Sequence, residues 1–423
     1  MTAILLGVLL TLMAVAFPIG FALMGTAAVT IPAAGMDLIS VPVQLFSGTD
    51  SFAILAVPLF ILMGELMSAT TIAHRLVELA VSLVGWMRGG LAHVNVLTNA
   101  FMAEMSGSAT ADAAVLSKIF VPEMERAGYP KAYAAACTAV NATIGIIIPP
   151  SIPMVLYGVT TNTSIRDLFI AGIVPGIILA GAFMLTCYIF ARRYNHPVDE
   201  HFELRRLKAS LRGALLPMLI PILVVGGLIG GIFTATEAAG VGVIIALIGG
   251  AFMSPDFTWK KLYDALVTTA RQTGVVMMLV AGSSVLGILV ANEQIPQHVA
   301  NGLQTFAHNP VLALLLINIF LLILGMFLQA AAAIIIVVPV LMPLAAKIGI
   351  DPVHFGIIVT LNLGIGQQTP PVATVLLTVC AITGLSIQQV MRYSKWFLIT
   401  MFAVLMLVSY APVTTLWFRH FIS

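Results

Sequence analysis

Long apolar runs alternate with short polar patches along the whole chain, and several runs reach the about 20 residues that a helix needs to cross a bilayer. This pattern predicts an all-α, polytopic membrane protein. Pro32 to Asp50 is instead rich in turn-forming residues, so we expect irregular structure there. The predicted spans are Ala3–Thr30 (one span bent at Pro18), Phe52–Ala69, Leu168–Phe190, Leu215–Ile232, Ala235–Met253, Gly274–Ala291 and Trp396–Trp417.

Three shorter segments predict helices outside the spans. Ile72–Arg88 places its apolar residues on one face and its charged residues elsewhere, which is typical of a helix lying at the membrane surface. Trp259–Arg271 predicts a second interfacial helix, and Pro296–His308 predicts a short connecting helix.

Two apolar runs, Tyr133–Thr161 and Phe355–Ile382, contain breaks that no continuous helix can pass, because each has two adjacent prolines that remove backbone donors. In lipid a broken helix persists only where it is buried in protein or lines a wet cavity. The breaks share one order of residues: Asn141, Gly145, Pro149 and Pro150 correspond to Asn362, Gly366, Pro370 and Pro371, and each pair differs by 221 in number. We infer an internal duplication.

Each break is preceded by a segment that predicts a re-entrant helical hairpin. Gly90–Arg126 has a small, polar centre at Glu104–Asp112, and Val311–Lys347 has its tip near Leu328. The loop Arg192–Arg212 is rich in basic residues and is therefore expected to be cytoplasmic. Counting spans outward from it places the two hairpins on opposite sides of the membrane, as an inverted-topology repeat requires.

These inferences predict a division of the chain. Residues 1–191 form the first repeat, with scaffold and arm helices in 1–89 and a hairpin and broken helix in 90–162. Residues 192–212 form a cytoplasmic linker. Residues 213–423 form the second repeat, with its hairpin and broken helix in 310–384.

Composition narrows the class of protein further. Only 9% of residues are charged, against about 25% in soluble domains. The net charge of +2 comes with no basic stripe, so nucleic acid is not an expected partner. Cys137, Cys187 and Cys380 lie in apolar runs without metal-ligand spacing. We expect Met1–Thr30 to be retained and not removed as a signal.

The breaks predict ion chemistry. A helix that stops in mid-membrane leaves its last carbonyls and first amides without partners, and these suit a cation and an anion respectively. Neutral hydroxyl and amide oxygens at the hairpin tips and breaks favour sodium over a transition metal. Simpler structural interpretations stay open: close helix packing for Ser106–Thr110, interhelical hydrogen bonds for Asn141 and Asn362, and an ion pair with Lys118 for Asp112.

Several motifs resemble the large membrane subunit of tripartite ATP-independent periplasmic (TRAP) transporters over essentially the whole length. They are Gly64–Met67, Arg88–Ala92, Ser106–Ala114, Val121–Met124, Ala127–Tyr129, Ile148–Gly158, Gly172–Gly176, Thr236–Gly240 and Thr369–Val372. The resemblance implies an elevator-type secondary transporter of the bacterial inner membrane. It would import an organic acid (a C4-dicarboxylate, a sialic acid or a sugar acid), driven by sodium and without another cofactor. The implied partners are a small four-helix membrane subunit and a periplasmic substrate-binding protein.

On this basis we expect two sodium sites with the anionic substrate between them. One would use Ser106, Gly107, Ser108, Asn141 and Gly145, and the other Gly325, Gln329, Asn362, Gly366 and Thr369. Candidate substrate contacts are Thr110, Asp112, Pro149, Pro150, Ser151, Gln368 and Pro370. Gln329 departs from the resembled family, which often carries an acidic residue before this tip, and the family's proline there is replaced by Ala332 or Ala333.

Other classes remain as alternatives. A single-component sodium–dicarboxylate symporter of similar architecture is the nearest, and gene neighbours encoding a small membrane protein and a secreted binding protein would distinguish the two. A channel has no need of interfacial arm helices and inverted hairpins. A membrane enzyme is disfavoured because we find no His-Glu-x-x-His, no Asp-rich metal motif and no nucleophile with a credible base.

Overall fold

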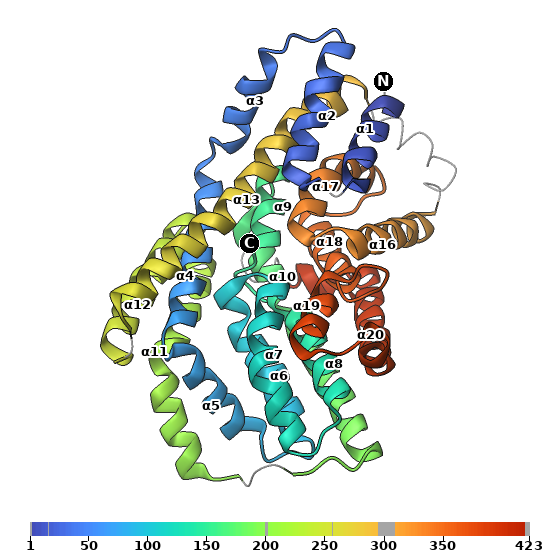
Figure 1. Ribbon diagram of the computed structural model, residues 1–423. Helices are drawn as coiled ribbons and strands as arrows, with labels where there is room; N and C mark the ends of the chain where they lie inside the picture. The colour runs from blue at the N-terminus through green and yellow to red at the C-terminus, as the bar shows by residue number, and fades with distance from the viewer. Residues whose placement is uncertain (1, 16, 199–201, 256, 295–308, 419–423) are drawn as a thin grey trace.

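The computed structural model describes residues 2–15, 17–198, 202–255, 257–294 and 309–418, and all regular elements in these ranges are helices. Eight of the described helices are long and apolar enough to cross a membrane. Figure 1 shows the helices running mostly along the long dimension of the molecule. The all-α, polytopic prediction is therefore confirmed.

The helices up to the linker are α1 (Thr2–Ala14), α2 (Ile19–Ala33), α3 (Ser40–Thr49), η1 (Phe52–Leu55), α4 (Ala56–Ala69), α5 (Ile72–Val84), α6 (Gly90–Ser106), α7 (Ala109–Arg126), α8 (Lys131–Asn141), η2 (Ala142–Ile146), α9 (Ile152–Thr161) and α10 (Ile165–Arg193). The helices after it are α11 (Leu204–Ile229), α12 (Ala235–Met253), α13 (Trp259–Asn292), α16 (Pro310–Phe327), α17 (Ala330–Lys347), α18 (Pro352–Gly366), α19 (Thr374–Thr383), α20 (Ile387–Tyr410) and α21 (Val413–Leu416).

Both hairpins and both broken helices are present. α6 and α7 meet at Gly107–Ser108, and α16 and α17 meet at Leu328–Gln329. The breaks separate α8 from α9 and α18 from α19. The halves exchange partners: α7 packs on α19 of the second break, while α17 packs on α9 of the first. The hairpin of each half therefore packs against the broken helix of the other half.

The predicted bent span Ala3–Thr30 is wrong. Pro18 has an extended backbone at the start of α2, and it separates two helices of 13 and 15 residues. At 1.5 Å per residue each is about 20 Å long, shorter than the about 30 Å hydrocarbon core. α1 and α2 lie side by side instead, and a Cβ on Gly25 would lie 3.3 Å from Leu12.

The turn-rich patch predicted at Pro32 to Asp50 is also wrong in part, because α3 forms there. Asp37 accepts a hydrogen bond from the Ile39 amide at 3.1 Å just before the helix begins. α3 packs against α13, where Gly48 fits closely against Ser284. This tertiary contact offsets the weak local helical preference of the sequence.

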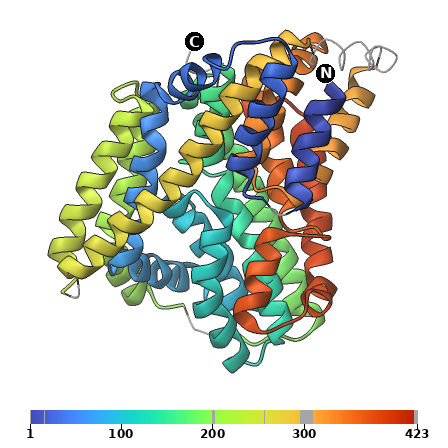
Figure 2. The ribbon, with the colours of Figure 1, turned by 45° about the horizontal axis from the view of Figure 1, so that its top comes forward.

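α13 is one continuous helix of 34 residues, about 51 Å long, and not the predicted interfacial helix followed by a span. The polar residues between the two predicted segments do not end the helix, because Gln272 donates a hydrogen bond to the Glu65 carboxylate of α4 at 2.9 Å. Figure 2 shows α13 running diagonally across the molecule, and it contacts α2, α3 and α4.

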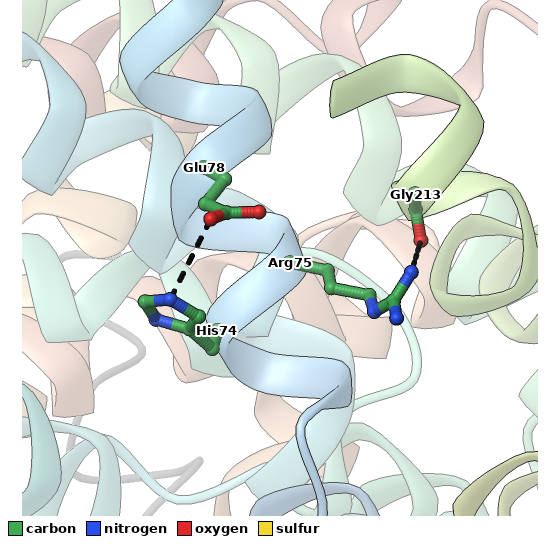
Figure 3. A network of polar contacts seen from close by, with 4 residues as sticks. All are labelled: His74, Arg75, Glu78 and Gly213. Carbon is green, nitrogen blue, oxygen red and sulfur yellow. Dashed lines mark hydrogen bonds and ion pairs between the residues drawn. The ribbon is translucent and has the colours of Figure 1, made fainter. Parts of the chain in front are cut away.

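The linker is shorter than predicted, because α11 already begins at Leu204. Its first turns pack on α5, which is helical as predicted but ends at Val84. The place of α5 at the membrane surface stays a prediction. Figure 3 shows Arg75 of α5 donating to the Gly213 carbonyl at 3.3 Å, and His74 lying 3.6 Å from Glu78.

Two further boundaries differ from the sequence predictions. The last long helix, α20, begins at Ile387 and not at Trp396, because Ser386 and Gln389 form a reciprocal cap at its start. The connecting helix predicted at Pro296–His308 lies outside the described residues. The division of the chain into two repeats at 192–212 stays a prediction.

Candidate functional site

The first break is closed by its own residues. α8 ends at Asn141, a 3-10 turn follows, and the Pro149–Pro150 bond is cis. Ser151 then caps α9: its hydroxyl donates to the Ile146 carbonyl at 2.6 Å and accepts from the Met154 amide at 3.5 Å. This predicted substrate residue is fully buried, and its hydroxyl is used within the break.

The second break lies against the second hairpin with backbone touching backbone. A Cβ on Gly366 would lie 2.5 Å from the Cα of Gly325, a separation that real side chains do not tolerate. The Ala373 amide, at φ +53°, also donates to the Met326 carbonyl at 3.2 Å. Gly325 and Gly366, predicted to belong to one site, are therefore in direct contact. Small residues at both positions make this approach possible.

Asn141 lies at the end of the first half-helix and is fully buried. Its Nδ2 donates to the Asn95 Oδ1 of α6 at 2.9 Å, and Asn95 in turn donates to the Thr138 hydroxyl at 2.7 Å. The Asn141 Oδ1 is buried, and no described residue donates a hydrogen bond to it. The side chain thus joins two helices and still leaves one carbonyl oxygen unpaired.

Asn362 repeats this arrangement in the second half. Its Nδ2 donates to the Asn318 Oδ1 of α16 at 2.7 Å and to the Ile358 carbonyl at 2.9 Å. Asn362 is fully buried, and its Oδ1 has no hydrogen-bond partner within the described part of the chain. A buried, unsatisfied amide oxygen costs about 1–3 kcal/mol, so two of them at equivalent positions call for a chemical explanation.

Gln368 bridges the two breaks. Its Nε2 donates to the Ala139 carbonyl at 2.5 Å and to the Thr143 hydroxyl at 3.1 Å. The side chain is fully buried, and its Oε1 is another amide oxygen, like those of Asn141, Asn362 and Asn99, that accepts no hydrogen bond from the described residues. It was predicted as a substrate contact, but its donor group is engaged with the first half of the chain.

The tip of the first hairpin lies beside the first break. Gly107 adopts φ +55°, and a Cβ there would lie 2.9 Å from the Ile152 side chain at the start of α9. Ser108 caps α7 and accepts from the Ala111 amide at 3.4 Å. Asp112 lies in the first turn of α7 and is only 4% exposed. The Ser106 side chain lies outside the described part of the chain.

The remaining predicted residues differ in how deeply they are buried. Gln329 is exposed at the tip of the second hairpin. Thr369 is half-buried and donates to the Ile365 carbonyl of its own helix at 2.9 Å. Thr110 and Pro370 are half-buried, while Gly145, Pro149 and Pro150 are buried inside the first break.

The oxygen chemistry of this region is mostly neutral. Across the described residues, no group of three or more His, Cys, Asp or Glu could hold a metal ion. The unpaired buried oxygens of Asn141, Asn362 and Gln368 come from amides, and that of Thr374 at the start of α19 comes from a hydroxyl; both kinds are hard and uncharged ligands. Such oxygens suit a weakly held monovalent cation better than a divalent or transition metal.

Asn95 and Asn318 were missed at the sequence level. They differ by 223 in residue number, the same offset that relates Gly64 to Gly287 and Ile72 to Ile295. A search for polar residues at that offset within the hairpin segments would have found them.

The chain was compared with known protein families by its sequence, and one family matches almost its whole length. The sequence family described as "Tripartite ATP-independent periplasmic transporter, DctM component" matches residues 6–414. This chain belongs to that family. It is therefore the membrane-embedded permease component of a three-part transporter of the bacterial inner membrane, and not an enzyme.

Named relatives agree with the family. The permease is 39% identical to the sialic acid TRAP transporter large permease protein SiaM of Vibrio cholerae over 88% of this chain and 87% of that protein. It is 37% identical to the C4-dicarboxylate TRAP transporter large permease protein DctM of Pseudomonas aeruginosa, over 89% of this chain and 88% of that protein.

A solved structure supports the fold alone. The YdaH transporter of Alcanivorax borkumensis, described as having an unusual topology, superposes with a TM-score of 0.61 at 16% identity. The match covers 90% of this chain and 89% of that chain. The predicted transporter architecture is therefore confirmed at the level of the fold.

Proposed function

We propose that this permease imports an organic anion with sodium as the coupling ion. The observation that carries the proposal is the pair of buried, unpartnered amide oxygens of Asn141 and Asn362. Asn141 is the last residue of α8, and Asn362 lies in the last turn of α18, so the carbonyls at each helix end follow along the same backbone. A cation bound there would satisfy oxygens that the protein leaves unpaired.

Sodium is favoured over a proton by the type of ligand. Amide oxygens do not titrate in the physiological range, so they bind a metal ion and not a transferable proton. Asp112 is the one carboxylate among the predicted site residues. The first site would use Asn141 with the carbonyls of the 3-10 turn around Gly145, and the second would use Asn362 with the backbone at Gly325 and Gly366.

An organic anion is favoured by the amide ends of the second half-helices. α9 begins beside the tip of the first hairpin, and α7 begins at that tip, so the N-termini of both helices lie at the tip. SiaM and DctM carry sialic acid and C4-dicarboxylate in their names. We propose a substrate with a carboxylate of this kind for the present chain.

The proposal includes an elevator movement and two partners. The hairpins and breaks would move together as one unit against a scaffold that includes α4, α11, α12 and α13. The tripartite family description supports two further components, and we propose that they are a periplasmic binding protein and a small four-helix membrane subunit. The binding protein would deliver the anion to the outer face.

Sodium replacement tests this proposal. Proteoliposomes containing all three components are loaded at fixed pH and membrane potential, and uptake of a labelled sialic acid, a C4-dicarboxylate and a sugar acid is measured. We expect uptake of one of these anions to require sodium outside. Uptake that is unchanged with choline in place of sodium and follows a proton gradient would refute sodium coupling.

A further inference from the structure

The side chain of Gln368 joins the second break to the first by hydrogen bonds. Its Nε2 donates to the Ala139 carbonyl at 2.5 Å and to the Thr143 hydroxyl at 3.1 Å, from the opposite half of the chain. Both bonds are buried, where hydrogen bonds are electrostatically stronger than in water.

The acceptors enclose the first cation site. Ala139 lies two residues before Asn141, and Thr143 lies two residues after it, where α8 gives way to the 3-10 turn. Carbonyls at such a helix end lack intrahelical partners, so the Ala139 oxygen can accept from outside its helix. Gln368 therefore clamps the stretch of backbone that positions the Asn141 side chain.

The donor is anchored in the second site. Gln368 follows Gly366 by two residues, and its amide donates to the Ile365 carbonyl at 3.0 Å. The breaks also touch directly, since a Cβ on Gly364 would lie 2.6 Å from the Cγ2 of Thr143. A small displacement of one break would therefore push against the other break, which is packed and hydrogen-bonded to it.

This bridge has no counterpart in the other direction. At the offset of 221 the residue equivalent to Gln368 is Ile147, whose side chain has no hydrogen-bonding group. The equivalents of the acceptors Ala139 and Thr143 are Thr360 and Gly364. The duplication therefore does not by itself account for Gln368. Burying the Gln368 amide at this junction also costs free energy of desolvation, which its hydrogen bonds must offset.

We infer that Gln368 is a positioning residue that couples the two cation sites, so that occupancy of one raises the affinity of the other. The inference rests on the sodium coupling proposed above. Binding at Asn141 shifts the backbone from Ala139 to Thr143, and the Gln368 amide transmits this shift to the turn after Gly366. Coupling of this kind is reciprocal between the sites.

The test compares the sodium dependence of uptake in the complete three-component transporter. Gln368→Leu keeps a side chain of similar size but removes both bridging hydrogen bonds. We expect the Hill coefficient for sodium to fall from above 1 towards 1. Thr143→Val removes one acceptor only, and we expect a smaller fall.

Gln367→Leu is the matched control. Gln367 is also buried, but its Nε2 donates at 3.4 Å to the Leu363 carbonyl of its own helix, so it makes no bridge. We expect its Hill coefficient to equal that of the original protein. If Gln368→Leu does not fold, as judged by gel filtration, Thr143→Val carries the test.

Two results would overturn the coupling while leaving sodium-driven transport intact. The first is a Hill coefficient of Gln368→Leu, or of Thr143→Val if Gln368→Leu does not fold, that equals the Hill coefficient of the original protein. The second is a sodium dependence of uptake by the original protein that is not sigmoidal. Uptake by the original protein that does not require sodium would instead refute the proposed function itself, and this inference with it.

Discussion

Asn362 donates a hydrogen bond to Asn318 at 2.7 Å, and Asn141 donates the equivalent bond to Asn95 at 2.9 Å. Each bond joins a broken helix to the first helix of the hairpin that precedes it. The two interpretations of these asparagines, interhelical hydrogen bonding and ion binding, are therefore compatible. The amide NH₂ holds the helices together, while the amide oxygen accepts no hydrogen bond from the described residues and stays free for the proposed cation.

We predict that Asn318 and Asn362 are energetically coupled. In a double-mutant cycle with Asn318→Ala and Asn362→Ala, the free energy of unfolding in detergent should reveal a coupling of about 0.6–1.7 kcal/mol, the range for hydrogen bonds within membrane proteins. Asn318→Ala combined with Thr378→Ala is the control, because Thr378 bonds only the Thr374 carbonyl of its own helix and should be additive. Additivity in the Asn318–Asn362 cycle would contradict the prediction.

A side chain on Gly366 should abolish transport. A Cβ there would lie 2.5 Å from the backbone of Gly325, so Gly366→Ala must separate the second hairpin from the second break. Gly274→Ala in α13 is the matched control, since its Cβ would meet nothing within 4 Å. We expect uptake by the complete transporter to be lost in the first variant and kept in the second. Normal uptake by Gly366→Ala would show that this contact opens freely.

The two hairpin tips should react from opposite sides of the membrane. In a background without Cys137, Cys187 and Cys380, single cysteines at Thr110 and Gln329 are exposed to an impermeant maleimide in oriented vesicles. We expect Thr110→Cys to label from the cytoplasmic side and Gln329→Cys from the outer side, since Thr110 is partly exposed and Gln329 is exposed.

Two exposed positions away from the tips calibrate this labelling. Lys208→Cys lies in the basic segment expected to be cytoplasmic, and Val413→Cys lies at the start of α21, after the last long helix, which is expected to end on the outer side. Labelling of both tips from one face only would contradict the inverted-topology repeat.

The chain alone should not accumulate substrate. No polar stretch of the sequence approaches about 50 residues, the lower limit for a soluble domain that could capture an anion from dilute solution. We therefore expect no uptake by the permease reconstituted by itself under an inward sodium gradient, and uptake once the small membrane subunit and a loaded binding protein are added. Strong uptake without any soluble protein would favour a single-component symporter.

The sequence by itself determined the features that depend on local chemistry. Adjacent prolines stop a helix wherever they occur, so Pro149–Pro150 and Pro370–Pro371 predicted both breaks. Apolar runs set the length of a span, and small residues at Gly107 and Ser108 marked the first tip. The constant offset of 221 revealed the duplication, and with it the paired hairpins and breaks.

Only the tertiary structure decided which helices continue and which amide oxygens stay unpaired. α13 runs through a polar patch because Gln272 finds Glu65 on a distant helix, and α1 folds back on α2 at Pro18. Gln368 and Ser151 are both polar residues in the sequence, yet Gln368 bridges the two halves of the chain and Ser151 caps its own helix. The physical reason is that a buried polar group takes its role from whatever partner packing brings within about 3 Å, and packing joins residues far apart in the chain.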